Sequence, residues 1–264
     1  MITSVSNKHM KEISQLNKKA KTRYERRVFV AEGMKMCMEA PKKDIVAMYV
    51  SESFIAKEGN RKLLAGYSYE TVSNRAFAAI SDTKTPQGIL CLVKMPKYRM
   101  EDLMKGRTKE GAKAKQALIL VLENIQDPGN LGTMIRTGEG AGVTGLLMSQ
   151  DSVDIFHPKV IRATMGSLYR VPFYVTPDLP GAIQRLKSWG VMAYAAHLEG
   201  SVEYSQPDYR RPTAFLVGNE GNGLSPQAAG LADCQVKIPL EGNVESLNAA
   251  VAAALLMYEA RRQR

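Results

Sequence analysis

Residues 117–136 decide the fold of the second half of this chain, and they read Ala117-Leu-Ile-Leu-Val-Leu-Glu-Asn-Ile-Gln-Asp-Pro-Gly-Asn-Leu-Gly-Thr-Met-Ile-Arg136. The apolar run at 117–122 is typical of a strand buried on both faces of a parallel sheet. The chain then turns at Asp127-Pro-Gly, and we expect a helix to begin near Leu131 with Asn130 as its N-cap. Glycine and polar residues therefore follow the carboxyl end of a strand, which is where open α/β sheets bind ligands.

A second loop of this kind reads Phe215-Leu-Val-Gly-Asn-Glu-Gly-Asn-Gly-Leu-Ser225. Three glycines within six residues indicate either positive φ angles or a ligand held close to the backbone. Ser225 as N-cap and Pro226 as the first helical residue predict that a helix follows. Glu220 is the only acid in this loop.

A third loop reads Ile238-Pro-Leu-Glu-Gly-Asn-Val-Glu-Ser-Leu-Asn248, and Ser246 is expected to cap a helix that runs to about residue 262. That helix is apolar almost all round and must be buried. It belongs either to the core of one chain or to the interface of a symmetric dimer. Each of the three loops follows a short apolar run and precedes a helical pattern, so the sequence predicts one composite site.

Residues 140–145, Gly-Ala-Gly-Val-Thr-Gly, fit the G-x-G-x-x-G pattern of dinucleotide binding. They follow a predicted helix and precede a predicted strand, whereas the fingerprint needs a strand before it and a helix after it. This order of elements argues against a nucleotide-dependent oxidoreductase. The sequence also lacks a phosphate loop of the form G-x-x-x-x-G-K-[ST].

The remaining pattern predicts two α/β domains joined by a basic linker. In the first domain, Met10, Ile13 and Leu16 are spaced by three and predict a helix over 7–22. The other elements expected there are a helix at 32–40 and strands at 28–30, 45–50 and 88–93. In the second domain, further strands are expected at 145–149, 173–175, 191–195, 214–217 and 234–238, and helices at 131–141, 158–166, 179–188, 225–231 and 246–262. The predicted bounds are 1–97 for the first domain, 98–116 for the linker and 117–264 for the second domain.

The net charge of +10 is distributed unevenly along the chain. Residues 1–116 contain 24 Lys and Arg against 12 Asp and Glu, whereas residues 117–264 contain 12 against 14. This asymmetry favours a polyanion-binding module attached to a near-neutral domain, although a solvated basic surface would have the same composition. The best candidates for RNA docking cluster around Tyr24 and are Lys18, Lys19, Arg23, Arg26 and Arg27.

The composition, with 45% hydrophobic and 23% charged residues, is that of a soluble globular protein. The longest apolar stretch, 249–258, is half of the roughly 20 residues that a membrane span needs. The first residues lack the apolar core of a signal peptide. Cys37, Cys91 and Cys234 fit neither a disulfide framework nor a CxxC metal site. We therefore expect a reducing, cytoplasmic location and no membrane contact.

The three loops, in this order and spacing, resemble the signature motifs of the SpoU/TrmH family of RNA ribose 2′-O-methyltransferases, part of the SPOUT superfamily. The matched cores are Asn130-x5-Arg136, Gly218-Asn-Glu-Gly-x-Gly, and Ile238-Pro-Leu followed by Ser246-Leu-Asn248. The resemblance covers about residues 117–264. Through Glu32-Gly33 and residues 81–90, the first part is similar to the small ribosomal-protein-like α/β domain that often precedes this domain and binds the RNA substrate.

The resemblance implies a knotted (trefoil) α/β methyltransferase domain, S-adenosylmethionine as cofactor, a homodimer and no metal. By position-wise match it assigns catalytic roles to the polar motif residues Asn130, Arg136, Glu220, Ser246 and Asn248. It implies that the main chain holds the cofactor around Leu216, Gly218, Ile238, Leu240 and Leu247. Residues 157–167 resemble a family stretch near the RNA entrance, with Lys159 and Arg162 as candidate phosphate contacts; a surface helix is the alternative.

The implied reaction aligns a ribose 2′-hydroxyl with the cofactor's methyl sulfonium and removes its proton. Family accounts often make the motif-one arginine the base, but a guanidinium rarely gives up its proton. We expect Arg136 to bind the adjacent phosphate and to stabilise the developing alkoxide. The expected substrate is 23S ribosomal RNA, with transfer RNA as the runner-up. A non-catalytic RNA-binding or ribosome-assembly module with the same fold is the alternative from another class.

Overall fold

A computed structural model describes residues 1–105, 116–198 and 202–264 of the chain. The chain forms two compact units. The first unit comprises Met1–Lys97 together with Phe156–Tyr169, and the second comprises Tyr98–Ile155 together with Arg170–Arg264. The segment 156–169 thus packs with the first unit, although its place in the sequence predicts that it belongs to the second domain.

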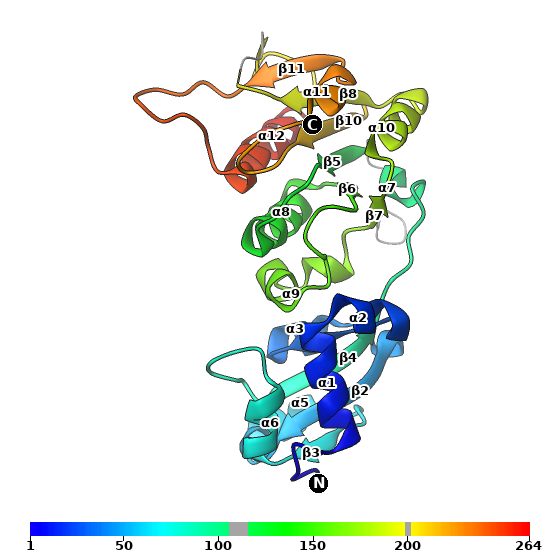
Figure 1. The fold of residues 1–264 in the computed structure, drawn as a ribbon, viewed down its shortest axis with the longest axis vertical. Helices are drawn as coiled ribbons and strands as arrows, with labels where there is room; N and C mark the ends of the chain where they lie inside the picture. Colours follow the sequence, from blue (N-terminus) through cyan, green and yellow to red (C-terminus); the bar gives the residue numbers. More distant parts are fainter. Residues whose placement is uncertain (106–115, 199–201) are drawn as a thin grey trace. The chain divides into compact units, whose positions relative to one another are not determined.

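The first unit is built on a mixed sheet in the order β1-β4-β2-β3. β4 is antiparallel to β1 and β2, and β3 is parallel to β2 (Figure 1). Within the described residues, its elements are α1 (Lys8–Lys18), α2 (Ala20–Arg26), β1 (Val28–Glu32), α3 (Met34–Glu39), the 3-10 helix η1 (Lys42–Asp44), β2 (Ile45–Ser51), α4 (Glu52–Ile55), α5 (Glu58–Leu63), β3 (Glu70–Val72), α6 (Asn74–Ile80), β4 (Ile89–Lys94), α9 (Pro158–Thr164) and η2 (Ser167–Tyr169).

The core of the first unit forms where α1 and α6 meet the sheet. The spacing of Met10, Ile13 and Leu16 places all three on one face of α1, and all three are fully buried. They pack with Phe77 of α6 and Leu90 of β4. The predicted helical period is therefore confirmed, and the helix ends before residue 22.

Aromatic residues fix the segment 156–169 within the first unit. The ring of Phe156 lies 5.0 Å from that of Phe29 in β1, and the ring of Tyr169 lies 6.3 Å from Phe29 on a stacked geometry. The Tyr169 hydroxyl donates a hydrogen bond of 3.0 Å to the carbonyl of Met36. Such aromatic contacts stabilise a core beyond the area they bury.

Arg23 has a structural role in the first unit that its sequence context does not indicate. Its side chain is only 3% exposed, and its guanidinium donates hydrogen bonds to the carbonyls of Leu16 (2.6 Å) and Asn17 (3.3 Å). These carbonyls belong to the last turn of α1, which lacks helical partners for them. The assignment of Arg23 to the RNA-binding surface is therefore wrong, because the group is buried and engaged.

The second unit is built on a parallel sheet, which in the described residues has the strand order β7-β6-β5-β10-β8-β11-β9 (Figure 1). Every pair of neighbouring strands in it is parallel. Its described elements are α7 (Asp102–Lys105), β5 (Leu118–Leu122), α8 (Pro128–Ala141), β6 (Gly145–Ser149), β7 (Phe173–Thr176), α10 (Leu179–Ser188), β8 (Met192–Ala196), β9 (Val202–Glu203), β10 (Thr213–Val217), α11 (Pro226–Gly230), β11 (Cys234–Lys237) and α12 (Ala249–Gln263). The predicted α/β class with a parallel sheet is confirmed.

The strand order places two of the three glycine-rich loops side by side. β5 and β10 are neighbours, with Leu122 opposite Val217 at their carboxyl ends. The chain leaves β5 toward β6 and β7, whereas β8 and β11 lie on the other side of β10. A point where the strand order reverses in this way opens a crevice at the carboxyl ends of the strands.

Helices cover both faces of this sheet. α7, α10 and α11 share one apolar core with β5, to which Leu103, Ile183 and Ala228 contribute. α8 and α12 pack against each other, and a Cβ atom added at Gly138 of α8 would lie only 3.5 Å from the sulfur of Met257 (Figure 1). The helix α12 buries one face and exposes another, because Leu256 is fully buried whereas Val251 is 49% exposed.

The predicted linker at 98–116 is described only in part. Residues 102–105 form α7, and Leu103 is fully buried in the core of the second unit. Residues 106–115 lie outside the described residues. In the three described ranges, no helix has both the length and the apolar character that a membrane span requires.

We predict that Arg23→Met destabilises the first unit. The variant removes the donor to two carbonyls at the end of α1, which should lower the local free energy of unfolding by about 1–3 kcal/mol. The measurement is amide hydrogen exchange over residues 8–32, which should become faster. Lys19→Met is the matched control at an exposed position and should change stability by less than about 0.5 kcal/mol. Unchanged protection in Arg23→Met would contradict the structural role.

Candidate active site

The carboxylate of Glu220 joins the second glycine-rich loop to the first. It accepts hydrogen bonds from the main-chain amides of Gln126 and Asp127, each at 3.0 Å. It also accepts a hydrogen bond from the side-chain amide of Asn130 at 3.0 Å. The two loops that follow β5 and β10 are thereby held in one fixed arrangement.

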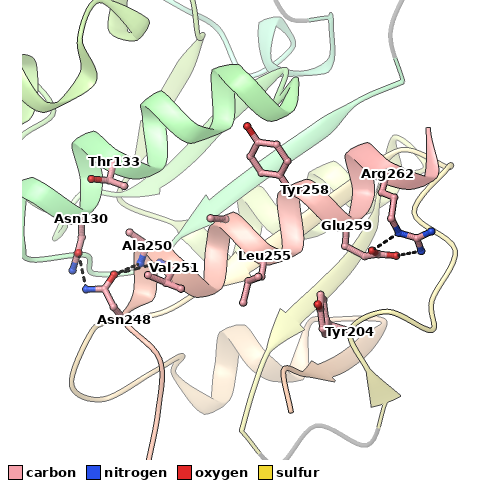
Figure 2. A pocket seen from close by; sticks show the side chains of 11 residues that line it. Asn130, Thr133, Tyr204, Asn248, Ala250, Val251, Leu255, Tyr258, Glu259 and Arg262 are labelled. Carbon is pink, nitrogen blue, oxygen red and sulfur yellow. Dashed lines mark hydrogen bonds and ion pairs between the residues drawn. The ribbon is translucent and has the colours of Figure 1, made fainter. Parts of the chain in front are cut away.

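Asn130 extends this chain of hydrogen bonds to the third loop. Its side-chain oxygen accepts a hydrogen bond of 2.9 Å from the side-chain amide of Asn248, as Figure 2 shows. The Asn248 oxygen accepts from the amides of Ala250 (2.9 Å) and Val251 (3.3 Å). Glu220, Asn130 and Asn248 thus link all three loops, and the expected composite site has a physical basis.

Two helix caps differ from those that the sequence predicts. Asp127, and not Asn130, caps α8, because its carboxylate accepts from the Asn130 amide at 2.7 Å and Pro128 is the first helical residue. Asn248, and not Ser246, caps α12. The cap at Asp127 leaves the side chain of Asn130 available to bridge Glu220 and Asn248. Ser225 caps α11 as predicted, with Pro226 as the first helical residue.

The charge of Glu220 is stabilised by its hydrogen bonds. Partial burial raises the pKa of this carboxyl, but the hydrogen bonds from Asn130, Gln126 and Asp127 lower the pKa by more. The pKa of Glu220 therefore lies below its ordinary value. The side chain is a carboxylate at neutral pH and acts only as a hydrogen-bond acceptor.

Further hydrogen bonds, formed by residues to which the motifs assign no role in the site, hold the same loops. The side chain of Asn219 donates to the carbonyl of Asn124 at 2.8 Å, and Asn124 adopts a positive φ of 54°. The carboxylate of Glu123 accepts from both the amide and the hydroxyl of Ser225, each at 2.7 Å. The signal for these residues was their position directly after β5 and β10.

Gly218 is required by a close approach of the chain to itself. A Cβ atom at this position would overlap the backbone of Gly223 and Leu224. Asn219 and Gly223 exchange two backbone hydrogen bonds of 2.9 Å across the tight turn that causes this approach. The other reason for a glycine, a positive φ angle, applies at Gly223, whose φ is 67°.

The five expected cofactor positions have different surroundings. Leu216 is fully buried within β10, opposite Val121 and Ala195. Gly218 follows that strand. The other three are half-buried in or beside the third loop and are Ile238, Leu240 and Leu247. No backbone hydrogen bond within the described residues involves residues 238–247, so their amides and carbonyls form a set of donors and acceptors without partners there.

Arg136 and Ser246 do not take part in the hydrogen-bonded cluster. Both side chains are exposed. Arg136 lies on α8, and within the described residues it makes no hydrogen bond or ion pair. The structure therefore brings together Asn130, Glu220 and Asn248, and it leaves the guanidinium of Arg136 accessible to a ligand.

A groove of about 540 Å³ begins at the Asn130–Asn248 pair and runs along α12 (Figure 2). Thr133 of α8 lines one side. Val251, Leu255 and Tyr258 line the groove from α12 (Figure 2), and Tyr258 is 51% exposed. The groove is thus polar at the Asn130–Asn248 pair and at the Glu259–Arg262 ion pair near its other end, and it is mainly apolar between them (Figure 2).

The predicted RNA-binding residues all lie in the first unit, where Lys18, Lys19 and Arg27 are exposed. Arg26 is exposed and forms an ion pair of 2.7 Å with Glu12. Arg162 of α9 forms an ion pair with Asp82. Arg23, as described above, is buried.

Comparison with known proteins extends these observations. Residues 117–258 match the model of the SpoU rRNA Methylase family, and residues 7–91 match that of the MRM3-like substrate binding domain. The chain is 32% identical to the 23S rRNA (guanosine(2553)-2′-O)-methyltransferase RlmP of Bacillus subtilis, with 98% of each protein covered.

Solved structures agree with the sequence comparisons. An AdoMet-bound rRNA methyltransferase from Sinorhizobium meliloti superposes with a TM-score of 0.82 at 29% identity, covering 99% of this chain and 97% of that one. The SpoU methyltransferase AviRb from Streptomyces viridochromogenes shares the fold, with a TM-score of 0.84 at 24% identity over 98% of each chain. The family match spans more than half of the chain and contains all three loops of the site. This protein belongs to the SpoU rRNA methylase family.

Proposed function

We propose that this protein transfers a methyl group from S-adenosylmethionine to a ribose 2′-hydroxyl of 23S ribosomal RNA. The observation that supports it best is the Glu220–Asn130–Asn248 chain, which joins the three family motifs in one hydrogen-bonded cluster. RlmP, a 23S rRNA 2′-O-methyltransferase, aligns along nearly its whole length, including the substrate-binding part. Transfer RNA is the second candidate substrate.

The residues present suit S-adenosylmethionine. Main-chain amides and carbonyls at 238–247 have no backbone partner in the described part of the chain, and they can recognise the polar edge of an adenine. The half-buried side chains of Ile238, Leu240 and Leu247 supply apolar contacts. When bound, the cofactor supplies an electrophilic methyl group on a sulfonium.

Arg136 has the chemistry to hold the RNA for this reaction. Its guanidinium is a planar cation that can donate two parallel hydrogen bonds to a phosphate. The same positive charge stabilises the alkoxide that develops as the 2′-hydroxyl loses its proton to that phosphate or to water. Asn130 and Asn248 orient the sugar, Ser246 donates from the third loop, and Glu220 fixes the position of Asn130.

The basic first unit supplies the RNA-binding surface in this proposal. Lys18, Lys19, Arg26 and Arg27 contribute positive charge from α1, α2 and their capping residues, and Arg162 contributes from α9. A non-catalytic RNA-binding module is disfavoured, because all five polar motif positions keep the residue types of the family. Because ribosomal RNA is the proposed substrate, the proposal also implies that the protein acts in the cytoplasm.

We also propose that the groove along α12 is closed by a second copy of the chain. Val251 and Tyr258 are large apolar residues that are 49% and 51% exposed. Exposed residues of this kind in one patch are typical of an interface, and an isologous dimer would pair the patch with itself. Because Asn130 and Asn248 line the same groove, the second copy would also close the site.

The test of the proposed function is methyl transfer by the purified protein. Labelled S-adenosylmethionine and unmethylated 23S ribosomal RNA should yield RNA with one 2′-O-methylated ribose, mapped by its resistance to alkaline cleavage. Arg136→Lys should lower the single-turnover rate by about 10- to 100-fold, since it keeps the charge but loses the planar pair of donors. Arg185→Lys, on α10, is the matched control. Absence of methyl transfer to ribosomal RNA would contradict the proposed function. A near-wild-type rate for Arg136→Lys would contradict the proposed role of Arg136.

Glu220→Gln should weaken the hydrogen bonds that join the first two glycine-rich loops, and the size of this effect should depend on pH. A carboxylate whose folded pKa is depressed contributes stability above its unfolded pKa, near 4.5, and loses this contribution as the pH falls through the folded pKa. We expect the variant to be less stable at pH 7 by up to about 1 kcal/mol, a figure reduced for solvent screening. This difference should shrink below pH 4.5.

The fluorescence of Trp189, the single tryptophan of the chain, reports unfolding of the second unit in urea. Glu101→Gln is the control, because Glu101 forms an exposed ion pair with Arg185. A stability difference between wild type and Glu220→Gln that stays constant from pH 7 to pH 3 would refute the proposed role of the carboxylate.

Val251→Arg should convert the proposed dimer into monomers. A charged side chain in the patch would lose contact with water in a symmetric interface, at a cost of several kcal/mol. Sedimentation velocity at micromolar concentration measures the change. Val175→Arg, at a residue of the edge strand β7 that is 40% exposed, is the control and should leave the dimer intact. A wild-type chain that sediments as a monomer would exclude the dimer.

A further inference from the structure

A buried carboxylate in the first unit anchors an exposed polar loop. Glu32, at the end of β1, is 8% exposed and accepts hydrogen bonds from the amide of Asp82 (3.0 Å) and the hydroxyl of Thr83 (2.8 Å). The hydroxyl of Ser81 donates to the same carboxylate. Within the described residues no cation forms an ion pair with Glu32. A buried carboxylate is costly unless it is hydrogen-bonded, so these three donors are needed to keep it there.

The other end of this loop is fixed as well. The side-chain oxygen of Gln87 accepts a hydrogen bond of 2.8 Å from the amide of Met34, and the carbonyl of Gly88 accepts one of 2.8 Å from the amide of Ser51. Gly88 has a φ of 86°, and a Cβ atom there would lie 2.9 Å from that of Phe54. The loop therefore has two rigid ends, and Lys84 is exposed between them.

The loop in turn holds a basic side chain of α9. The carboxylate of Asp82 accepts a hydrogen bond from one terminal nitrogen of Arg162. The side chain of Arg162 is 31% exposed, and its other nitrogens have no hydrogen-bond partner within the described residues. The buried carboxylate of Glu32 thus holds the main chain at Asp82, and the carboxylate of Asp82 restricts the position of the Arg162 guanidinium through one of its terminal nitrogens.

Stability alone does not account for this arrangement. An ion pair that is about one third exposed contributes at most about 1 kcal/mol. An acid on a surface that binds a polyanion also lowers the local positive charge and opposes binding. An aspartate beside Arg162 favours RNA binding only if the orientation of the guanidinium contributes more to binding than the one unit of positive charge that Asp82 cancels.

We propose that Glu32 and Asp82 are positioning residues that orient Arg162 toward a phosphate of the RNA substrate. The inference rests on the proposed function, which supplies the RNA. The nitrogens of Arg162 that Asp82 does not bind form a planar set of donors, which suits a phosphate. Two exposed lysines add positive charge nearby: Lys84 on the loop and Lys159 on α9. The Asp82–Arg162 contact joins these two elements.

The test uses the sign of the change in RNA affinity. Asp82→Asn raises the net charge by one, so a purely electrostatic surface would bind RNA more tightly. Positioning predicts the opposite, a rise in Kd of about fivefold and a salt slope smaller by about 0.7, as expected when one phosphate contact is lost. Filter binding of in vitro-transcribed 23S ribosomal RNA to the full chain, across a series of salt concentrations, measures both quantities.

Two further variants complete the test. Arg162→Lys should weaken binding to a similar extent, and the double variant should be no weaker than either single one, because both act through the same contact. Glu58→Gln makes the same change in charge at an exposed ion pair with Lys62 and should leave Kd unchanged or lower it. Glu32→Gln should reproduce the loss seen with Asp82→Asn.

Binding by Asp82→Asn at or above wild-type affinity would overturn the inference, as would additive effects in the double variant. Melting temperatures distinguish these outcomes from unfolding, and Arg162→Lys decides the matter if Asp82→Asn does not fold. Wild-type binding without methyl transfer would contradict the proposed function alone, because RNA affinity is measured separately from catalysis.

Discussion

The pairing of β5 with β10 is the constraint on which the site depends. These strands are far apart in sequence but adjacent at the centre of a parallel sheet, with their carboxyl ends in register. Every residue of both strands is buried, so the hydrophobic effect fixes the pairing strongly. A shift of one residue would turn buried side chains to the other face, and it would also separate the two loops that Glu220 joins.

Hydrogen bonds to carboxylates convert this adjacency into fixed geometry. Glu123 holds the start of α11, and Glu220 holds the start of the chain segment that leads into α8. Asn130 then transmits the arrangement to Asn248, which caps α12. Glu123, Glu220 and Asn248 each accept from main-chain amides near a helix start, and such amides would otherwise lack partners.

The sequence predicted the elements of the second unit well where the signal was local. The strand at 145–149 has the expected bounds, and Ser225 and Pro226 begin α11 as predicted. The errors lie at caps, where Asp, Asn and Ser differ by only fractions of a kcal/mol and the local sequence does not select among them. Asp127-Pro indicated a turn, although proline is also favoured at the first position of a helix.

Contacts between residues that are far apart in the sequence could not be predicted from local sequence patterns. Nothing near Arg23 distinguishes it from the exposed Lys19, because its burial depends on the angle between α1 and α2. The bond between Asn130 and Glu220 joins residues that are 90 positions apart. The family motifs named both residues as parts of one site, but only the fold shows that they touch.

Both units use the same solution to the problem of placing acids in a protein that binds RNA. Glu32 and Glu220 are stabilised by amides and hydroxyls, and neither forms an ion pair within the described ranges. If an arginine or a lysine replaced these neutral donors, it would satisfy each carboxylate equally well, but its charge would no longer be available to a phosphate. Neutral donors let each carboxylate order a loop while cations such as Arg136 and Lys84 stay accessible. Loop order and positive charge, which acidic residues usually bring into conflict, are therefore obtained together.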